Sequence, residues 1–344
     1  MAERPLRRFG PLVALACAAG LLAFALPGLA GPYPQTTLEP HSEVARLIDG
    51  LLDNIVLWCT IIFVLVEGAL VVTVLRFRRR PGSPPARPIH GNTPLEILWT
   101  IIPAIILALI AVPTVKTIFR IQAVPKNALE VEVVGHQWWW EFRYPQLGVT
   151  TANELYIPAG RDIAFTLTSV DVIHSFWVPA FGGKRDVIPG RTNHMWFNAG
   201  ATGVFPGQCT EYCGASHANM LFKVVAQEQP QFDAWVAQQK APVAAPDTMT
   251  LAARGLAIYK QSLCVGCHTI DGISFATVGP NLSKVATRST IASGIYPNDP
   301  EHLRAWIKNA PSMKPGSLMP AGGKDMNLSN PDVEALAAYL ETRR

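Results

Sequence analysis

Two long apolar runs dominate the first third of the chain. Residues 55–75 are apolar except for Glu67, and residues 97–115 carry no charge at all. Each run has close to the ~20 residues that an α-helix needs to cross the hydrocarbon core of a bilayer. The pattern therefore predicts a helical hairpin over residues 40–122, with membrane spans at about 52–76 and 95–117.

A third apolar run lies near the N-terminus. Residues 11–26 are apolar, with arginines before them and small residues after them. This order is typical of a secretory signal that is removed after export, and we assign it to residues 1–31. An uncleaved third span is the alternative, which the breaks at Gly20 and Pro27 disfavour.

The charge between the two long runs indicates their direction. Residues 76–95 hold five arginines and no acidic residue. By the positive-inside rule such a loop faces the cytoplasm. Everything after Arg120 is then exported, which agrees with an N-terminal export signal.

The chain changes character after residue 128. Short runs rich in Val, Ile, Phe, Thr and Trp alternate with Gly, Pro and Asn, which predicts a β-sandwich or barrel. The predicted strands are 129–134, 163–168, 173–178, 194–197 and 221–225. Residues 227–247 are rich in Gln, Ala and Pro and read as a semi-rigid tether, with a helix around 232–239. A further domain begins near residue 248.

Composition excludes several classes of protein. Of the 344 residues 49% are hydrophobic and 16% charged, which argues against a disordered chain. The net charge is only +4, and no basic block lies outside the arginine-rich loop, so nucleic acid is not an expected partner.

A cluster of soft ligands lies near the end of the β region. Cys209, Cys213, His217 and Met220 fall within twelve positions, and His174 lies upstream in a predicted strand. Thiolate, imidazole and thioether together favour copper, whereas methionine is a poor ligand for zinc. A disulfide or a redox-active thiol pair is the alternative for the two cysteines.

A second cysteine motif begins the last domain. Cys264, Cys267 and His268 form the C-x2-C-H pattern of covalent c-type haem attachment. A thioredoxin-like pair is the alternative, which the adjacent histidine disfavours. The sixth iron ligand is expected to be a methionine, and three are available: Met313, Met319 and Met326.

Several segments together resemble a known family. Residues 207–220, 135–140, 174–179 and 96–105 resemble cytochrome c oxidase subunit II, and residues 251–344 resemble a class I cytochrome c. The combination resembles subunit II of a haem-copper oxidase of the caa type. This implies a multi-domain membrane protein: the two-helix transmembrane hairpin, a cupredoxin-like β-barrel at 127–228, a linker at 229–248 and an all-α class I cytochrome c domain at 249–344.

The resemblance also implies roles for the copper ligands. Cys209 and Cys213 would bridge two copper ions of a dinuclear copper A centre. His174 and Met220 would complete one ion, and His217 with the Glu211 carbonyl would complete the other. The Glu211 carboxylate would bind Mg²⁺ or Mn²⁺ shared with subunit I, a hard cation that prefers oxygen.

Further roles are implied for the haem domain and the flanking residues. The Pro280 carbonyl would orient His268, and Gly255 and Tyr259 would pack against the last helix. Met319 is followed by Pro320, as the family's ligand commonly is, so it is the predicted axial ligand, with Met313 in reserve.

Two residues carry weaker expectations. The resemblance places Trp138 near the point where electrons enter, against the alternative of core packing. It places Glu96 at the mouth of a proton path into subunit I, against the alternative of an acid that anchors the helix end.

The implied function is that of a subunit of an oxidoreductase, cytochrome c oxidase. Electrons from cytochrome c, or another respiratory-chain donor, would pass through haem c and copper A to subunit I, which reduces oxygen and pumps protons. Subunit I, subunit III and membrane lipid are the expected partners. The chain would lie in a bacterial inner membrane with both mature termini and both redox domains outside. A copper-A-containing nitric oxide reductase and a free-standing membrane-anchored electron shuttle are the alternatives.

Overall fold

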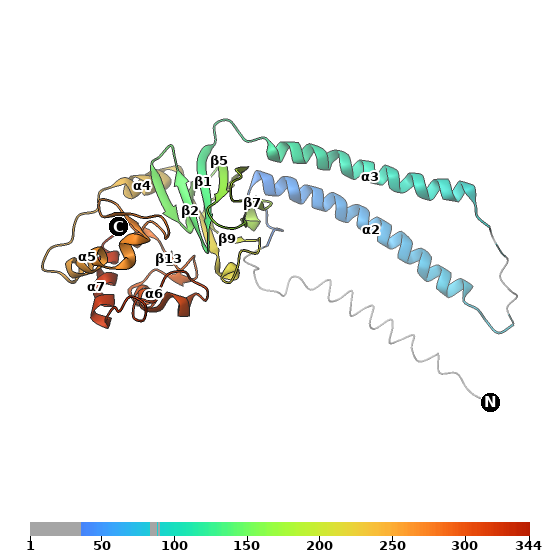
Figure 1. Cartoon of the computed structure of the whole chain (residues 1–344). Helices are drawn as coiled ribbons and strands as arrows, with labels where there is room; N and C mark the ends of the chain where they lie inside the picture. The colour runs from blue at the N-terminus through green and yellow to red at the C-terminus, as the bar shows by residue number, and fades with distance from the viewer. Residues whose placement is uncertain (1–35, 83–87, 89) are drawn as a thin grey trace, which may run out of the picture. The chain divides into compact units, whose positions relative to one another are not determined.

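The predicted spans form two long helices, α2 (Glu43–Phe77) and α3 (Thr93–Gln122), which contact each other over part of their length and separate away from the β domain (Figure 1). At 1.5 Å per residue, the 35-residue helix α2 and the 30-residue helix α3 are both longer than the ~30 Å thickness of a hydrocarbon core. Their large apolar side chains face outward. The computed structural model describes residues 36–82, 88 and 90–344, so the predicted signal at 1–31 lies outside the described residues.

Polar contacts join the hairpin to the β domain. The Ser42 hydroxyl accepts a hydrogen bond from the Ala45 amide at the start of α2 and donates one to the Phe181 carbonyl at 2.7 Å. Arg120 near the end of α3 pairs with Glu43 at 2.6 Å. The Ser42 bond ties the β domain to the start of α2, and the ion pair joins α3 to α2 at the same end of the hairpin.

The β domain consists of two five-stranded sheets around one apolar core, the cupredoxin-like arrangement that the resemblance implies. The first sheet has the order β3-β2-β1-β5-β8: β3 (Val149–Ala152), β2 (Trp139–Tyr144), β1 (Leu129–His136), β5 (Asp162–Ser169) and β8 (Asn193–Asn198). The second has the order β4-β10-β9-β6-β7: β4 (Glu154–Pro158), β10 (Leu221–Gln227), β9 (Gly203–Cys209), β6 (His174–Trp177) and β7 (Arg185–Val187). Pairs β1–β5 and β4–β10 are parallel, and the other pairs are antiparallel.

Half of these strands lie where the apolar runs predict them, and half do not. Strands β1, β5, β6, β8 and β10 match the predicted runs, whereas β2, β3, β4, β7 and β9 are additional. Strand β9 contains Pro206 and two glycines, residues that usually break strands. It is held nonetheless by pairing with β10 on one side and β6 on the other.

The predicted linker begins as a helix. Helix α4 (Gln229–Lys240) buries Phe232 and Trp235 in the core of the β domain. The Trp235 ring stacks on Tyr156 with centroids 4.6 Å apart. The first half of the segment is therefore part of the β domain's packing, and residues 241–247 make the connection.

The last domain is built mainly from helices, as expected. Helices α5 (Leu251–Gln261) and α7 (Asn330–Glu341) cross so closely that a Cβ on Gly255 would lie 1.9 Å from the Ala335 carbonyl. Tyr259 packs on Tyr339, which confirms the predicted contact with the last helix. The remaining elements are short helical turns, two small hairpins and one further helix: η5 (Leu263–Gly266), β11 (Thr269–Ile270), β12 (Ser274–Phe275), η6 (Val285–Thr287), β13 (Thr290–Ile291), β14 (Tyr296–Pro297) and α6 (Pro300–Met313).

Candidate metal centre and haem cavity

The predicted copper ligands converge at one end of the β domain. His174 begins β6 and Cys209 ends β9, and these two strands pair through Phe176 and Cys209. Cys213 and His217 lie on the loop that follows β9, and Met220 immediately precedes β10. The second sheet thus brings together residues that are 46 positions apart at most.

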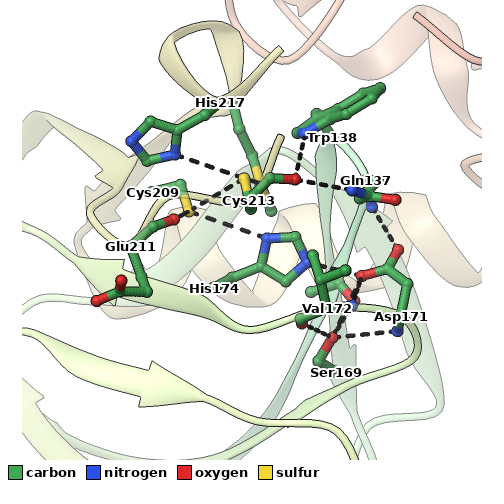
Figure 2. Close-up of polar contacts among 12 residues, drawn as sticks. Gln137, Trp138, Ser169, Asp171, Val172, His174, Cys209, Glu211, Cys213 and His217 are labelled. Carbon is green, nitrogen blue, oxygen red and sulfur yellow. Dashed lines mark hydrogen bonds and ion pairs between the residues drawn. The ribbon is translucent and has the colours of Figure 1, made fainter. Parts of the chain in front are cut away.

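The side chains form one continuous cluster (Figure 2). The Cys209 and Cys213 sulfurs are 3.8 Å apart, and both cysteines are free. The Nδ1 atom of His174 lies 3.9 Å from the Cys209 sulfur, and Nδ1 of His217 lies 3.4 Å from the Cys213 sulfur. The Met220 sulfur is 3.8 Å from Cys213, and the Glu211 carbonyl is 3.3 Å from Cys209. Every predicted ligand atom therefore flanks the sulfur pair.

The cluster is buried and favours a thiolate. His174, Cys209, Cys213 and Met220 are all buried. The hydrogen bond that Cys209 shares with Cys213 lowers the pKa of Cys209 to about 4, even though burial opposes the shift. The same contact, together with burial, raises the pKa of Cys213. A cation at this site would bind a preformed thiolate and displace the proton of the second thiol.

Asp171 orients the histidine and was not predicted from the sequence. Its Oδ1 atom lies 2.8 Å from Nε2 of His174, so that Nδ1 faces the sulfurs. Burial alone would lower the pKa of His174, but the bond to Asp171 and the contact with Cys209 outweigh it and raise the pKa. A carboxylate that fixes the free nitrogen of a ligand histidine is common in metal sites. In the sequence, the signal that could have indicated this contact is an aspartate three residues before His174.

Trp138 links this cluster to the neighbouring cavity. Its indole N–H donates to the Cys213 carbonyl at 3.0 Å, and the Gln137 amide donates to the same oxygen at 2.7 Å. Trp138 lies in the turn between β1 and β2, whereas Trp140 lies in β2, and both residues belong to the buried core.

Glu211 and Glu96 both have partners within the chain. The Glu211 carboxylate lies 3.5 Å from Nζ of Lys184. Oε1 of Glu96 accepts a hydrogen bond from the Asn92 amide at 3.1 Å, while the Asn92 side chain caps the start of α3. Glu96 thus holds the residue that caps the start of α3, a contact that suits an acid anchoring the helix end.

The C-x2-C-H motif borders an apolar cavity. Cys264, Cys267 and His268 line it, and of the three candidate methionines Met319 and Met326 do so as well. The Met313 carbonyl instead accepts a hydrogen bond from the Tyr296 hydroxyl. The cavity thus offers two thiols, an imidazole and a thioether, the set that attaches and ligates haem c.

The position of His268 suits an iron ligand. Its Nδ1 atom lies 2.8 Å from the Pro280 carbonyl, which can only accept, so Nδ1 carries the proton and Nε2 is free to bind metal. A Cβ on Gly279 would lie 2.5 Å from the His268 ring, so this close approach requires glycine. Burial lowers the pKa of His268, which keeps the ring neutral. The predicted role of the Pro280 carbonyl is thus matched by the geometry.

One half-buried charge supports an anionic group in the same cavity. Arg288 lines the cavity, and its buried Nε atom has no hydrogen-bond partner among the residues that the structure describes. Burial lowers the pKa of this guanidinium to about 10, so it remains charged at neutral pH. The carboxylates of a haem would suit this guanidinium, and the residues present therefore fit the group.

Known proteins match all three parts of the chain. The transmembrane domain of cytochrome c oxidase subunit II matches residues 36–117, its periplasmic domain matches 146–227, and cytochrome c matches 252–344. Cytochrome c oxidase subunit 2 of Alkalihalophilus pseudofirmus is 40% identical over 93% of this chain and 94% of its own length. The subunit 2 of Bacillus sp. strain PS3 is 38% identical over the same shares. The solved periplasmic domain of subunit II from Bradyrhizobium japonicum is 38% identical over 34% of this chain and 97% of its own, with a TM-score of 0.34.

Proposed function

Because the chain belongs to the cytochrome c oxidase subunit II family, we propose that it carries electrons from a bound haem c to a dinuclear copper A centre and on to subunit I. Subunit I would then reduce oxygen to water and translocate protons. The observation that carries this proposal is the position of Trp138. Trp138 lines the haem cavity and its indole N–H donates to the Cys213 carbonyl, so a single residue contacts both sites.

The cluster supports the proposed copper ligands. Cys209 and Cys213 would hold both ions, with His174 and Met220 as further donors to one and His217 and the Glu211 carbonyl as further donors to the other. The copper pair would supply a one-electron couple at this site. Rigid strands and the Asp171 contact hold the ligands still, so little rearrangement accompanies each transfer.

In the haem domain, Cys264 and Cys267 would attach the group covalently, and His268 and Met319 would be the ligands of its iron. Haem c supplies a reversible one-electron couple when bound. The Pro280 carbonyl fixes the orientation of His268, and Arg288 offsets the charge of an anionic substituent. The apolar lining excludes water, which together with the methionine sulfur favours the reduced state.

The remaining partners and placement belong to the same proposal. The exported domains lie outside a bacterial inner membrane, with the donor, cytochrome c or another respiratory carrier, on that side. Within this chain the Glu211 carboxylate pairs with the cation Lys184. We therefore expect Glu211 to bind Mg²⁺ or Mn²⁺ only together with further oxygen ligands from subunit I. Subunit III and a proton path near Glu96 complete the expected assembly.

Purification from membranes tests this function. We expect the chain to copurify with a subunit I that carries two further haems, and reduced cytochrome c to drive oxygen uptake by the complex. A complex that consumes nitric oxide without oxygen uptake would identify a nitric oxide reductase instead. A chain that purifies alone with its haem and copper would be a free-standing shuttle.

A further inference from the structure

A carboxylate of the β domain is buried among groups of the haem domain. Glu154 begins β4 and is fully buried. Its Oε1 atom accepts hydrogen bonds from the Ser289 amide and hydroxyl at 3.0 and 2.8 Å, and from the Thr290 amide and hydroxyl at 2.9 and 2.8 Å. Four donors from one short segment, 135 or 136 positions away, therefore converge on a single oxygen.

The charge of Glu154 is balanced within its own domain. Lys223 on β10 lies 3.2 Å from Oε1 and also contacts the Ser289 hydroxyl, and the Tyr156 hydroxyl donates to Oε2 at 3.1 Å. Burial would raise the pKa of Glu154, but Lys223 and the bonds from Thr290 and Ser289 lower it. The group is therefore an ionised acceptor whose shape matches the donors opposite.

The same segment of the haem domain is held at its other end. The Ser293 hydroxyl donates to the Trp138 carbonyl at 2.8 Å, and Lys314 donates to that carbonyl at 2.5 Å and to Ser293 at 2.7 Å. Thr290 and Ser293 both line the haem cavity together with Trp138. Residues 289–293 thus run from Glu154 to Trp138 along the border of the cavity.

We propose that Glu154 is a positioning residue that sets the register in which the haem domain docks on the β domain. By holding residues 289–293 against Trp138, it keeps the haem cavity beside the copper cluster. The effect on electron transfer rests on the function proposed above, whereas docking itself does not. A carboxylate suits this task because it only accepts, and every group opposite it donates.

The test uses the complete oxidase complex with the Glu154→Gln variant. The glutamine amide can keep its oxygen on the donors of Ser289 and Thr290, but it loses the charge that faces Lys223. It also places an N–H₂ group where Oε2 accepts from the Tyr156 hydroxyl and the Ser289 amide, so two donors then face a donor. We expect the peptide covering 285–298 to exchange its amide hydrogens at least ~10-fold faster, and internal electron transfer from haem to copper to slow by a similar factor. Glu130→Gln, at an exposed position of β1, is the matched control and leaves both unchanged.

A variant in the other domain guards against misfolding of the β domain. Thr290→Val keeps the shape and removes one donor, so we expect the same two changes at about threefold. Unchanged exchange in both variants, with intact copper and haem spectra, would overturn the docking role. Faster amide exchange with an unchanged rate of electron transfer from haem to copper would support the docking role. It would refute the proposal that electrons pass from the haem to copper by way of Trp138.

Discussion

Replacing Cys213 by serine is expected to abolish the delocalised copper pair while leaving haem c intact. The two sulfurs are 3.8 Å apart and each lies beside a histidine nitrogen, so removing one would destroy the proposed bridge between the ions. Electron delivery to subunit I should fall by more than the ~10–100-fold that loss of an outer partner of a metal ligand costs. Electron paramagnetic resonance of the purified complex measures the pair, and the haem absorption spectrum measures the other domain.

Cys59→Ser is the matched control. Cys59 lies exposed on α2, far along the chain from the cluster, and its replacement should change neither spectrum. A delocalised signal that survives in Cys213→Ser would refute the bridging assignment. A wild-type protein that binds no copper after metal loading would also refute it, and would favour a redox-active thiol pair.

Replacing Met319 by alanine is expected to remove the thioether-to-iron absorption feature and to lower the haem potential by on the order of 0.1 V. The thioether stabilises ferrous iron, and Met319 lines the cavity that holds Cys264 and His268. Spectroscopy and a redox titration of the complex provide both readouts. Copper signals should not change.

Two other methionines provide the comparison. Met326 also lines the cavity, whereas the Met313 carbonyl is bonded to Tyr296. Met326→Ala and Met313→Ala should both keep the absorption feature and most of the potential. If Met326→Ala loses the feature and Met319→Ala retains it, the choice based on the Met319-Pro320 pair is wrong.

The site was predictable where its residues lie in short motifs. Cys209 to Met220 and Cys264 to His268 place most donors within a few positions, and soft ligands at such spacing have few other uses. The two spans were equally clear because a bilayer demands long apolar runs. Asp171 was missed because an exposed turn is an ordinary place for an aspartate, and only the folded strand directs its carboxylate to His174.

Long-range pairing explains the other omissions. Strand β9 has a sequence unfavourable to strands, and only its two neighbours hold it in the sheet. Glu154 reads as a solvated glutamate beside Asn153, because its partners at Ser289 and Thr290 belong to another domain. No local pattern encodes which surfaces of two domains meet.

The most direct test of electron transfer from haem c to copper A is stopped-flow reduction of copper in the full-length oxidase, over series of dilution and salt. A docked, covalently attached haem domain acts at a fixed distance, so its transfer rate should not change on dilution and should depend only weakly on salt. An oxidase whose chain ends after residue 245 keeps α4 and should need an added soluble donor, with a steep dependence on concentration and salt. If the full-length enzyme shows that same steep dependence, electrons reach copper from outside, and the fused haem is not their route.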